Sequence, residues 1–378
     1  MRGAISMAVT LTLSVLTAGC ASGSGGSASP GAGSGAGGAS SGTIPAKSLP
    51  VGPTQWPVRT SMHVDLWLHS FALISTDTLP VPLYRRGYRD SVSAVRARAN
   101  VLTALDGNRA TLSAGLAQSP NYLQAQFLPF DFASWDEMRT AAERFLQFQG
   151  EPRRAPDEAT AARVAQFAAI FATPADREWL RLFVASAQDE QSRWFGGEHA
   201  RVVSARARVT AAVENLWMNS YRARFERFLN NTSQRFGDMQ LSLPIGGEGR
   251  TGNGRERQTV VATTWPGRVE DAREAIVVFA HEITGSMVGG IVSDNTTPAE
   301  KRDGQGDRYV SAGQVRAGAL LIEKVAPELL DPYMRYYLAQ SGVRADGGVS
   351  AAFTRTYQLP TAIVDALRKQ IEIVLGGI

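Results

Sequence analysis

Apolar residues recur at helical spacing through the first half of the folded chain, from about Ser61 to Leu229. Side chains three, four and seven positions apart lie on one face of a helix, so this spacing predicts helices that each bury one side. The positions that define the pattern are Leu66, Leu73, Ile74, Phe145, Leu146, Val164, Phe167, Phe171, Leu180, Phe183 and Val184. We therefore predict an all-helical region over residues 56–230.

Helix ends in this region are marked by proline and glycine, which interrupt a helical backbone. Breaks are expected at residues 80–82, 119–121, 129, 150–152 and 196–197. Thr173 followed by Pro174 is typical of an N-cap with proline at the first helical position. Ser134, with Glu137 three residues later, matches a capping box that would open another helix.

The pattern changes after Asn231. Residues 236–244 and 259–265 predict two short strands, and residues 246–257 between them predict a glycine-rich polar turn. A long apolar helix is expected over residues 275–291. The chain is therefore predicted to be α+β and mostly helical, with the short strand pair in a second region, residues 231–378, that ends in helices.

A targeting segment is predicted over residues 1–19. A basic start at Arg2 is followed by an apolar run, too short for a transmembrane helix, and then by small residues before Cys20, the only cysteine. This order resembles a bacterial lipoprotein signal, with Thr17 as a departure from the usual pattern. The resemblance implies that Cys20 becomes the mature N-terminus and carries the lipid, palmitate included. The alternative is a cleaved secretory signal with an incidental Cys20.

Residues 20–50 are expected to be a lipidated, flexible tether. They are mostly Gly, Ser, Ala and Pro, which bury too little apolar surface to offset the entropy of ordering. The lipid would anchor the protein to a membrane of the cell envelope. Ala21 stands where an aspartate is associated with inner-membrane retention, which favours the outer membrane, facing the periplasm, in an organism that has one.

The formal net charge of +4 comes from arginines spread through segments such as residues 201–208 and 222–227, where acidic or small residues separate them. Such charges are typical of solvated helix faces. A nucleic-acid site would need a dense basic patch with aromatic residues between the charges, so no nucleic-acid partner is expected. Because no cysteine follows Cys20, any metal would be bound by His, Asp, Glu or Gln.

The predicted helix over residues 275–291 contains His281 and Glu282. In the zinc-peptidase motif His-Glu-x-x-His, two histidines four residues apart bind the ion from one helix face, and the glutamate acts on the metal-bound water. Gly285 stands at the place of the second histidine. It has no side-chain donor atom, so the two-histidine clamp cannot form.

The order of strand, glycine-rich turn, strand and His-Glu helix resembles the zincin peptidases, particularly the gluzincins, over residues 231–338. The resemblance implies that His281 is a metal ligand, that Glu282 is the general base, and that the strand before the helix borders a cleft for an extended peptide. It also implies a third ligand, a glutamate on a second helix. Gln314 stands at the best matching position, and Glu323 could replace it only with a shift of that helix.

The other three histidines are His63, His69 and His199. On a helix, His63 and His69 diverge by roughly 120 degrees and would chelate one ion poorly. His69 is interpreted as a core histidine hydrogen-bonded to a neighbour, with a role facing His281 across a cleft as the alternative. His199 follows two glycines and is expected to be exposed at a helix start.

These observations favour a non-catalytic cell-envelope lipoprotein with no resident cofactor, whose former peptidase cleft binds a peptide or partner protein or only supports structure. The competing hypothesis is a zinc-dependent hydrolase in which His281 and substitute ligands hold the ion and Glu282 is the general base. A third hypothesis is a helical scaffold without a cleft. It would be favoured if a neighbouring helix sealed Gly285 and if Glu282 were paired internally.

Overall fold

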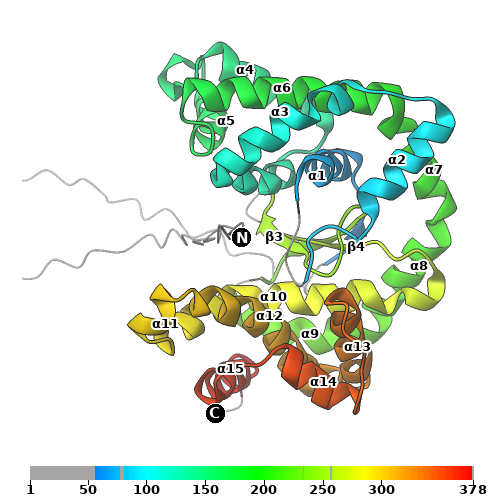
Figure 1. Ribbon diagram of the computed structural model, residues 1–378, viewed down its shortest axis with the longest axis vertical. Helices are drawn as coiled ribbons and strands as arrows, with labels where there is room; N and C mark the ends of the chain where they lie inside the picture. The colour runs from blue at the N-terminus through cyan, green and yellow to red at the C-terminus, as the bar shows by residue number, and fades with distance from the viewer. Residues whose placement is uncertain (1–55, 77–80, 233, 256–257, 377–378) are drawn as a thin grey trace, which may run out of the picture. The chain divides into compact units, whose positions relative to one another are not determined.

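The computed structural model describes residues 56–76, 81–232, 234–255 and 258–376. The predicted signal segment, Cys20 and the tether lie outside these residues. The predicted α+β, mostly helical class is confirmed: helices surround one small mixed sheet (Figure 1). Trp56, the first described residue, is fully buried, and its indole nitrogen donates to the main-chain oxygen of Gln234 at 3.0 Å.

The first half of the described chain is helical, as predicted, apart from the short strand β1, Val58–Arg59. The helices are α1 (Met62–Ile74), α2 (Tyr88–Ala99), α3 (Ala104–Gln118), η1 (Pro120–Asp131), α4 (Trp135–Gln147), η2 (Pro152–Arg154), α5 (Glu158–Ala168), α6 (Pro174–Glu190), η3 (Gln191–Phe195), α7 (Gly196–Ala205), α8 (Ala207–Leu216), η4 (Trp217–Tyr221) and α9 (Arg222–Asn231). The predicted N-cap at Thr173 is present, whereas only half of the capping box predicted at Ser134 forms, because the Glu137 side chain accepts from the Ala133 amide and not from the Ser134 amide. The Thr173 side chain accepts from the Asp176 amide, and the Ser134 side chain accepts from the Glu137 amide.

The break expected at residues 196–197 is wrong. The helix continues from α6 through the π-helical turn η3 into α7. The wider turn brings the Gln191 carbonyl oxygen within 2.9 Å of where a Cβ on Gly196 would lie. Glycine here therefore permits a bulge in a continuous helix and does not end it.

The sheet has four strands, so the prediction of only two strands is wrong. Strands β2 (Gly237–Ser242) and β4 (Thr259–Thr264) match the two predictions, but they lie parallel, with Gly237 opposite Thr259. Parallel strands cannot be joined by a tight turn. The glycine-rich connection accordingly contains a further strand, β3 (Arg250–Asn253), antiparallel to β4. The strand order is β1-β2-β4-β3.

Helices also make up the second half of the described chain after β4. They are α10 (Arg273–Asp294), α11 (Pro298–Arg302), α12 (Gln305–Val325), α13 (Leu330–Gln340), α14 (Val349–Thr356) and α15 (Thr361–Val374), with the short turns η6 (Val269–Asp271) and η7 (Pro327–Leu329). Helices α10 and α12 pack side by side along much of their length (Figure 1). The helices predicted around His281 and Gln314 are thus present.

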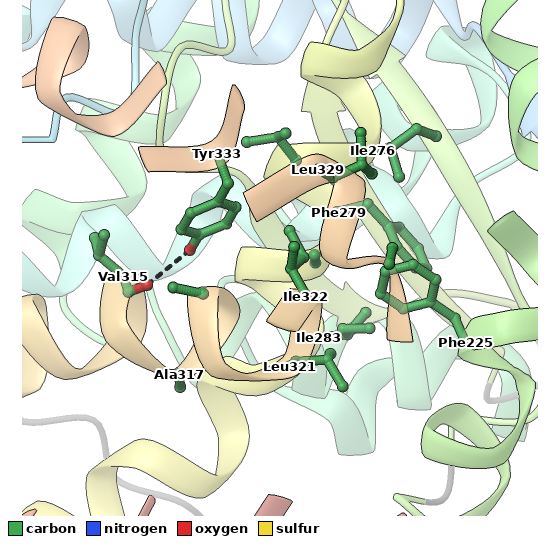
Figure 2. Packing of buried hydrophobic residues seen from close by; sticks show 14 of the residues in the cluster. Phe225, Ile276, Phe279, Ile283, Val315, Ala317, Leu321, Ile322, Leu329 and Tyr333 are labelled. Carbon is green, nitrogen blue, oxygen red and sulfur yellow. Dashed lines mark hydrogen bonds between the residues drawn. The ribbon is translucent and has the colours of Figure 1, made fainter. Parts of the chain in front are cut away.

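Two clusters of buried side chains form the core. One lies among α1, α3, α4, α5 and α6, around Trp67, Phe71 and Phe183. The other joins α8 and α9 to α10, α12 and α13, with Phe225 and Phe279 in contact (Figure 2). Both clusters belong to one compact unit.

One helical stretch in the part of the chain that the structure describes, Val269–Asp294, is long and apolar enough to cross a membrane. It comprises η6 and α10, and its residues from Ala275 to Ala280 are buried against the second core cluster. A buried core helix passes the same test of length and hydropathy, so this stretch is weak evidence for a membrane span.

Candidate functional site

Helix α10 holds His281 and Glu282 at the end of its most apolar stretch. The six residues before them are essentially inaccessible to solvent, and the His281 side chain is 3% exposed. Gly318 of α12 lets the two helices approach, because a Cβ there would lie 3.1 Å from the His281 Cα and against the Tyr333 hydroxyl. That hydroxyl donates to the Val315 carbonyl at 2.9 Å (Figure 2). Close helix packing therefore sets the position of His281.

The three positions that the zincin resemblance assigns to metal ligands lie next to one another. A Cβ on Gly285 would have Gln314 Nε2 as its nearest neighbour, at 3.6 Å, and the Gln314 main chain lies beside His281. Gly285 and Gln314 are both partly exposed. Glu323, the substitute considered for Gln314, is exposed further along α12. Gly285 of α10 and Gln314 of α12 are therefore neighbours across the contact between these two helices.

These residues do not fit a zinc ion. His281 supplies one imidazole, Gly285 has no donor, and Gln314 offers a neutral amide in place of a carboxylate. Among the described residues, no group of three or more His, Cys, Asp or Glu side chains is arranged to hold a metal.

The imidazole of His281 is held neutral. Burial lowers its pKa to about 3, although the neighbouring Gln314 main chain favours the charged ring. No group within the described residues makes a hydrogen bond of acceptable geometry with its Nδ1. The centres of the His281 and Tyr337 rings lie 5.1 Å apart.

Glu282 is held by strand β3. Its Oε2 accepts a hydrogen bond from the Thr251 hydroxyl at 3.0 Å, and its Oε1 lies 3.7 Å from His281 Nε2. Burial, with repulsion from Glu248, raises the pKa of Glu282 to about 7. The Arg250 charge and the Thr251 hydrogen bond oppose that rise without cancelling it. Near neutral pH this carboxyl group is therefore protonated in a substantial fraction of molecules.

A main-chain segment covers Glu282. We call residues 246–249 the glycine loop. A Cβ on Gly249 would lie 2.5 Å from the Glu282 Cγ, so the loop can run this close only without a side chain there. On the other side, the Tyr336 and Tyr337 hydroxyls donate to the carbonyls of Gly246 and Gly247 at 3.2 and 3.0 Å. Tyr336 and Tyr337 of α13 thus hold the glycine loop through their hydroxyl groups.

None of the other histidines reaches this site. His63 Nε2 is bonded to the main-chain oxygens of Pro129 and Phe132. His69 is a core histidine, as predicted: its Nε2 lies 3.1 Å from Glu190 Oε1, and its Nδ1 lies 2.9 Å from the Tyr88 hydroxyl. These partners, and not His281, occupy both of its ring nitrogens.

The expectation that His199 is exposed is wrong. It is 5% exposed, and its Nε2 lies 3.2 Å from Asp65 Oδ2 of α1. Asp65 is itself fully buried and accepts from the Leu243 amide at the end of β2. The continuous helix through residues 196–197 carries His199 into this contact. Sequence reasoning missed the pair because its members are 134 positions apart.

The raised pKa of Glu282 predicts a pH-dependent stability difference. A carboxyl group that keeps its proton longer in the folded state makes the free energy of unfolding fall as pH rises from about 4.5 to about 7. Glu282→Gln cannot ionise. Urea titrations give the free energy of unfolding of the variant and of the original protein. We expect the difference between them, variant minus original, to be about 2 kcal/mol larger at pH 8 than at pH 5. A difference that does not change between these pH values would contradict the prediction.

No protein-family model, curated protein or solved structure matches this chain.

Proposed function

We propose that this protein is a cell-envelope lipoprotein whose second region has a zincin-like framework without metal chemistry, and that it binds a peptide or partner protein or supports structure. One observation carries the proposal. Positions 281, 285 and 314 converge, yet only His281 has a side chain that suits zinc. Convergence without donors is the arrangement expected of a metallopeptidase framework that has lost its ion.

The surroundings of Glu282 support a non-catalytic role. A general base in a zinc hydrolase acts on water bound by the metal, and these residues cannot assemble the metal site. The Glu282 carboxyl group is instead engaged by Thr251 and lies under Gly249. The hypothesis of a helical scaffold without a cleft required Glu282 to be paired internally, which it is. It also required a neighbouring helix to seal Gly285, but Gly285 is partly exposed.

A binding role is supported by the position of β3. It is the last strand of the order β1-β2-β4-β3, and its Thr251 contacts Glu282. The main-chain groups of an edge strand can pair with an extended peptide. Phe127 and Phe130 of η1 pack close to Gly252, so the accessible part of this edge is short. In this proposal Cys20 carries the lipid that holds the protein at the membrane.

Metal content tests the proposal directly. The chain starting at Thr43 would be purified with added zinc and analysed by mass spectrometry beside His281→Ala. We expect well under one zinc per chain in both proteins. About one zinc per chain in the unchanged protein, lost in His281→Ala, would overturn the proposal and favour the zinc hydrolase with substitute ligands.

A further inference from the structure

Two arginines from distant segments meet at the end of strand β4. Arg85 precedes α2, and Arg206 lies between α7 and α8. The Arg206 guanidinium donates to the Trp265 carbonyl at 2.8 Å, and the Arg85 guanidinium donates to the same oxygen. Arg85 also donates to the Thr264 hydroxyl at 2.8 Å. One carbonyl group therefore holds two positive charges side by side, although like charges repel each other.

Neither guanidinium forms an ion pair within the described residues, and each has donors that are not used. Their other hydrogen bonds go to main-chain carbonyls, from Arg85 to Ile245 at 3.1 Å and from Arg206 to Pro266 at 3.3 Å. Arg85 Nη1 and Arg206 Nη2 are left without an acceptor in the described part of the chain, and neither nitrogen is sealed from solvent. Because an arginine that is largely buried is ordinarily paired with an anion, this arrangement lacks a counter-ion.

The acidic side chains whose charges reach this pair do not supply that counter-ion. Asp65 lies against His199, whose Nε2 is 3.2 Å from its Oδ2. Burial raises the pKa of Glu274, so its ionised form is disfavoured. Burial also lowers the pKa of both arginines. An anion beside the two guanidinium groups would offset the cost of keeping them charged in this environment.

A buried hydroxyl group without a partner lies at the same end of the sheet. Ser242 is the last residue of β2 and is paired in parallel register with Thr264, the last residue of β4. Ser242 Oγ is inaccessible to solvent and has no hydrogen-bond partner among the described residues. Such a group usually indicates a missing water or ion. Open sheets with parallel strands bind their ligands outside the carboxyl ends of those strands, which is where the two arginines lie.

We propose that Arg85 and Arg206 form a binding site for a phosphate group at the carboxyl end of β4. A guanidinium presents its N–H donors in a planar fork that matches the oxygens of phosphate. Two cations with unused donors match a doubly charged tetrahedral anion better than a single carboxylate. The source is free phosphate or the headgroup of a lipid at the membrane. Neither arginine contacts His281 or Glu282, so this site goes beyond the proposed function.

Calorimetric titration of the full-length protein with inorganic phosphate, at constant ionic strength, tests the site. Arg206→Gln removes one charge but keeps a donor for the Trp265 carbonyl. We expect the dissociation constant of phosphate to rise at least about tenfold in this variant, because a charge-assisted hydrogen bond is lost. Arg206→Lys keeps the charge without the fork and should lie between. The matched control is Arg208→Gln, an exposed arginine near the start of α8, which should bind phosphate as the original protein does.

The same titrations with glycerophosphoglycerol, the soluble headgroup of phosphatidylglycerol, separate the two sources. Tighter binding of inorganic phosphate would support a site for free phosphate, and tighter binding of the headgroup would support a lipid site. The proposal is overturned if neither probe binds. It is also overturned if Arg206→Gln weakens binding no more than Arg208→Gln does, because the effect would then reflect net charge alone. No outcome depends on zinc, so this site and the proposed function can fail separately.

Discussion

Gly285→His combined with Gln314→Glu is expected to create a zinc site at His281. The two changes complete a set of two imidazoles and one carboxylate with His281, the ligand set of gluzincins. A Cβ at position 285 would be accommodated, since its nearest neighbour would be the Gln314 amide at 3.6 Å, the side chain that is replaced in the same variant. We expect about one zinc per chain and zinc affinity at least about a thousandfold above that of the original protein, about 4 kcal/mol.

The controls decide what a positive result means. Adding His281→Ala to the double variant should abolish binding, and each single change alone should bind zinc much more weakly than the pair. Calorimetry and metal analysis measure both effects. If the double variant folds but takes up no zinc, the three positions do not form a zincin-like site and the resemblance loses its main support.

Glu190→Ala is expected to destabilise the first core by about 3 kcal/mol, because it breaks a buried ion pair and removes the acceptor of His69 and Thr103, although Arg96 keeps its pair with Asp106. The Glu190 side chain is inaccessible to solvent and accepts hydrogen bonds from Arg96, His69 and Thr103. Arg96 is also 5% exposed at its side chain, so water cannot replace the lost carboxylate. The free energy of unfolding from urea titrations measures the loss.

Glu178→Ala is the matched control on the same helix. Glu178 pairs with Arg181, and both side chains are more than half exposed. Solvent screens such a pair, so the urea midpoint should not change measurably. A similar small effect for Glu190→Ala would show that the buried cluster contributes little. Glu190→Gln, which keeps the shape but not the charge, should lie between the two.

The helices were predictable because their signals are local. Apolar spacing and the caps at Ser134 and Thr173 depend on residues within a few positions of each other. Both side chains cap their helices, although the capping box predicted at Ser134 lacks its reciprocal bond. The glycines were harder to interpret. Gly196 lies inside a continuous helix, because it permits the wider π-helical turn before it and does not end the helix.

The candidate site was only partly predictable. The spacing around His281 locates the helix, and the loss of a donor at Gly285 is visible in the sequence alone. The raised pKa of Glu282 could not be foreseen, because it arises from burial and from Glu248 in a separate segment. The hydrogen bonds between residues 81–86 and Gly246 could not be foreseen either, because they join main-chain atoms, which every residue type has.

The sequence by itself determined the helical character of the chain, the absence of cysteine ligands beyond Cys20 and the lack of a second histidine at position 285. These follow from side-chain chemistry and short-range periodicity. Only the tertiary structure decided that β2 and β4 run parallel, that His199 is buried against Asp65, and that a glycine loop covers Glu282. Each of these depends on pairing between distant segments, whose energy comes from burial and main-chain hydrogen bonds that local patterns do not encode.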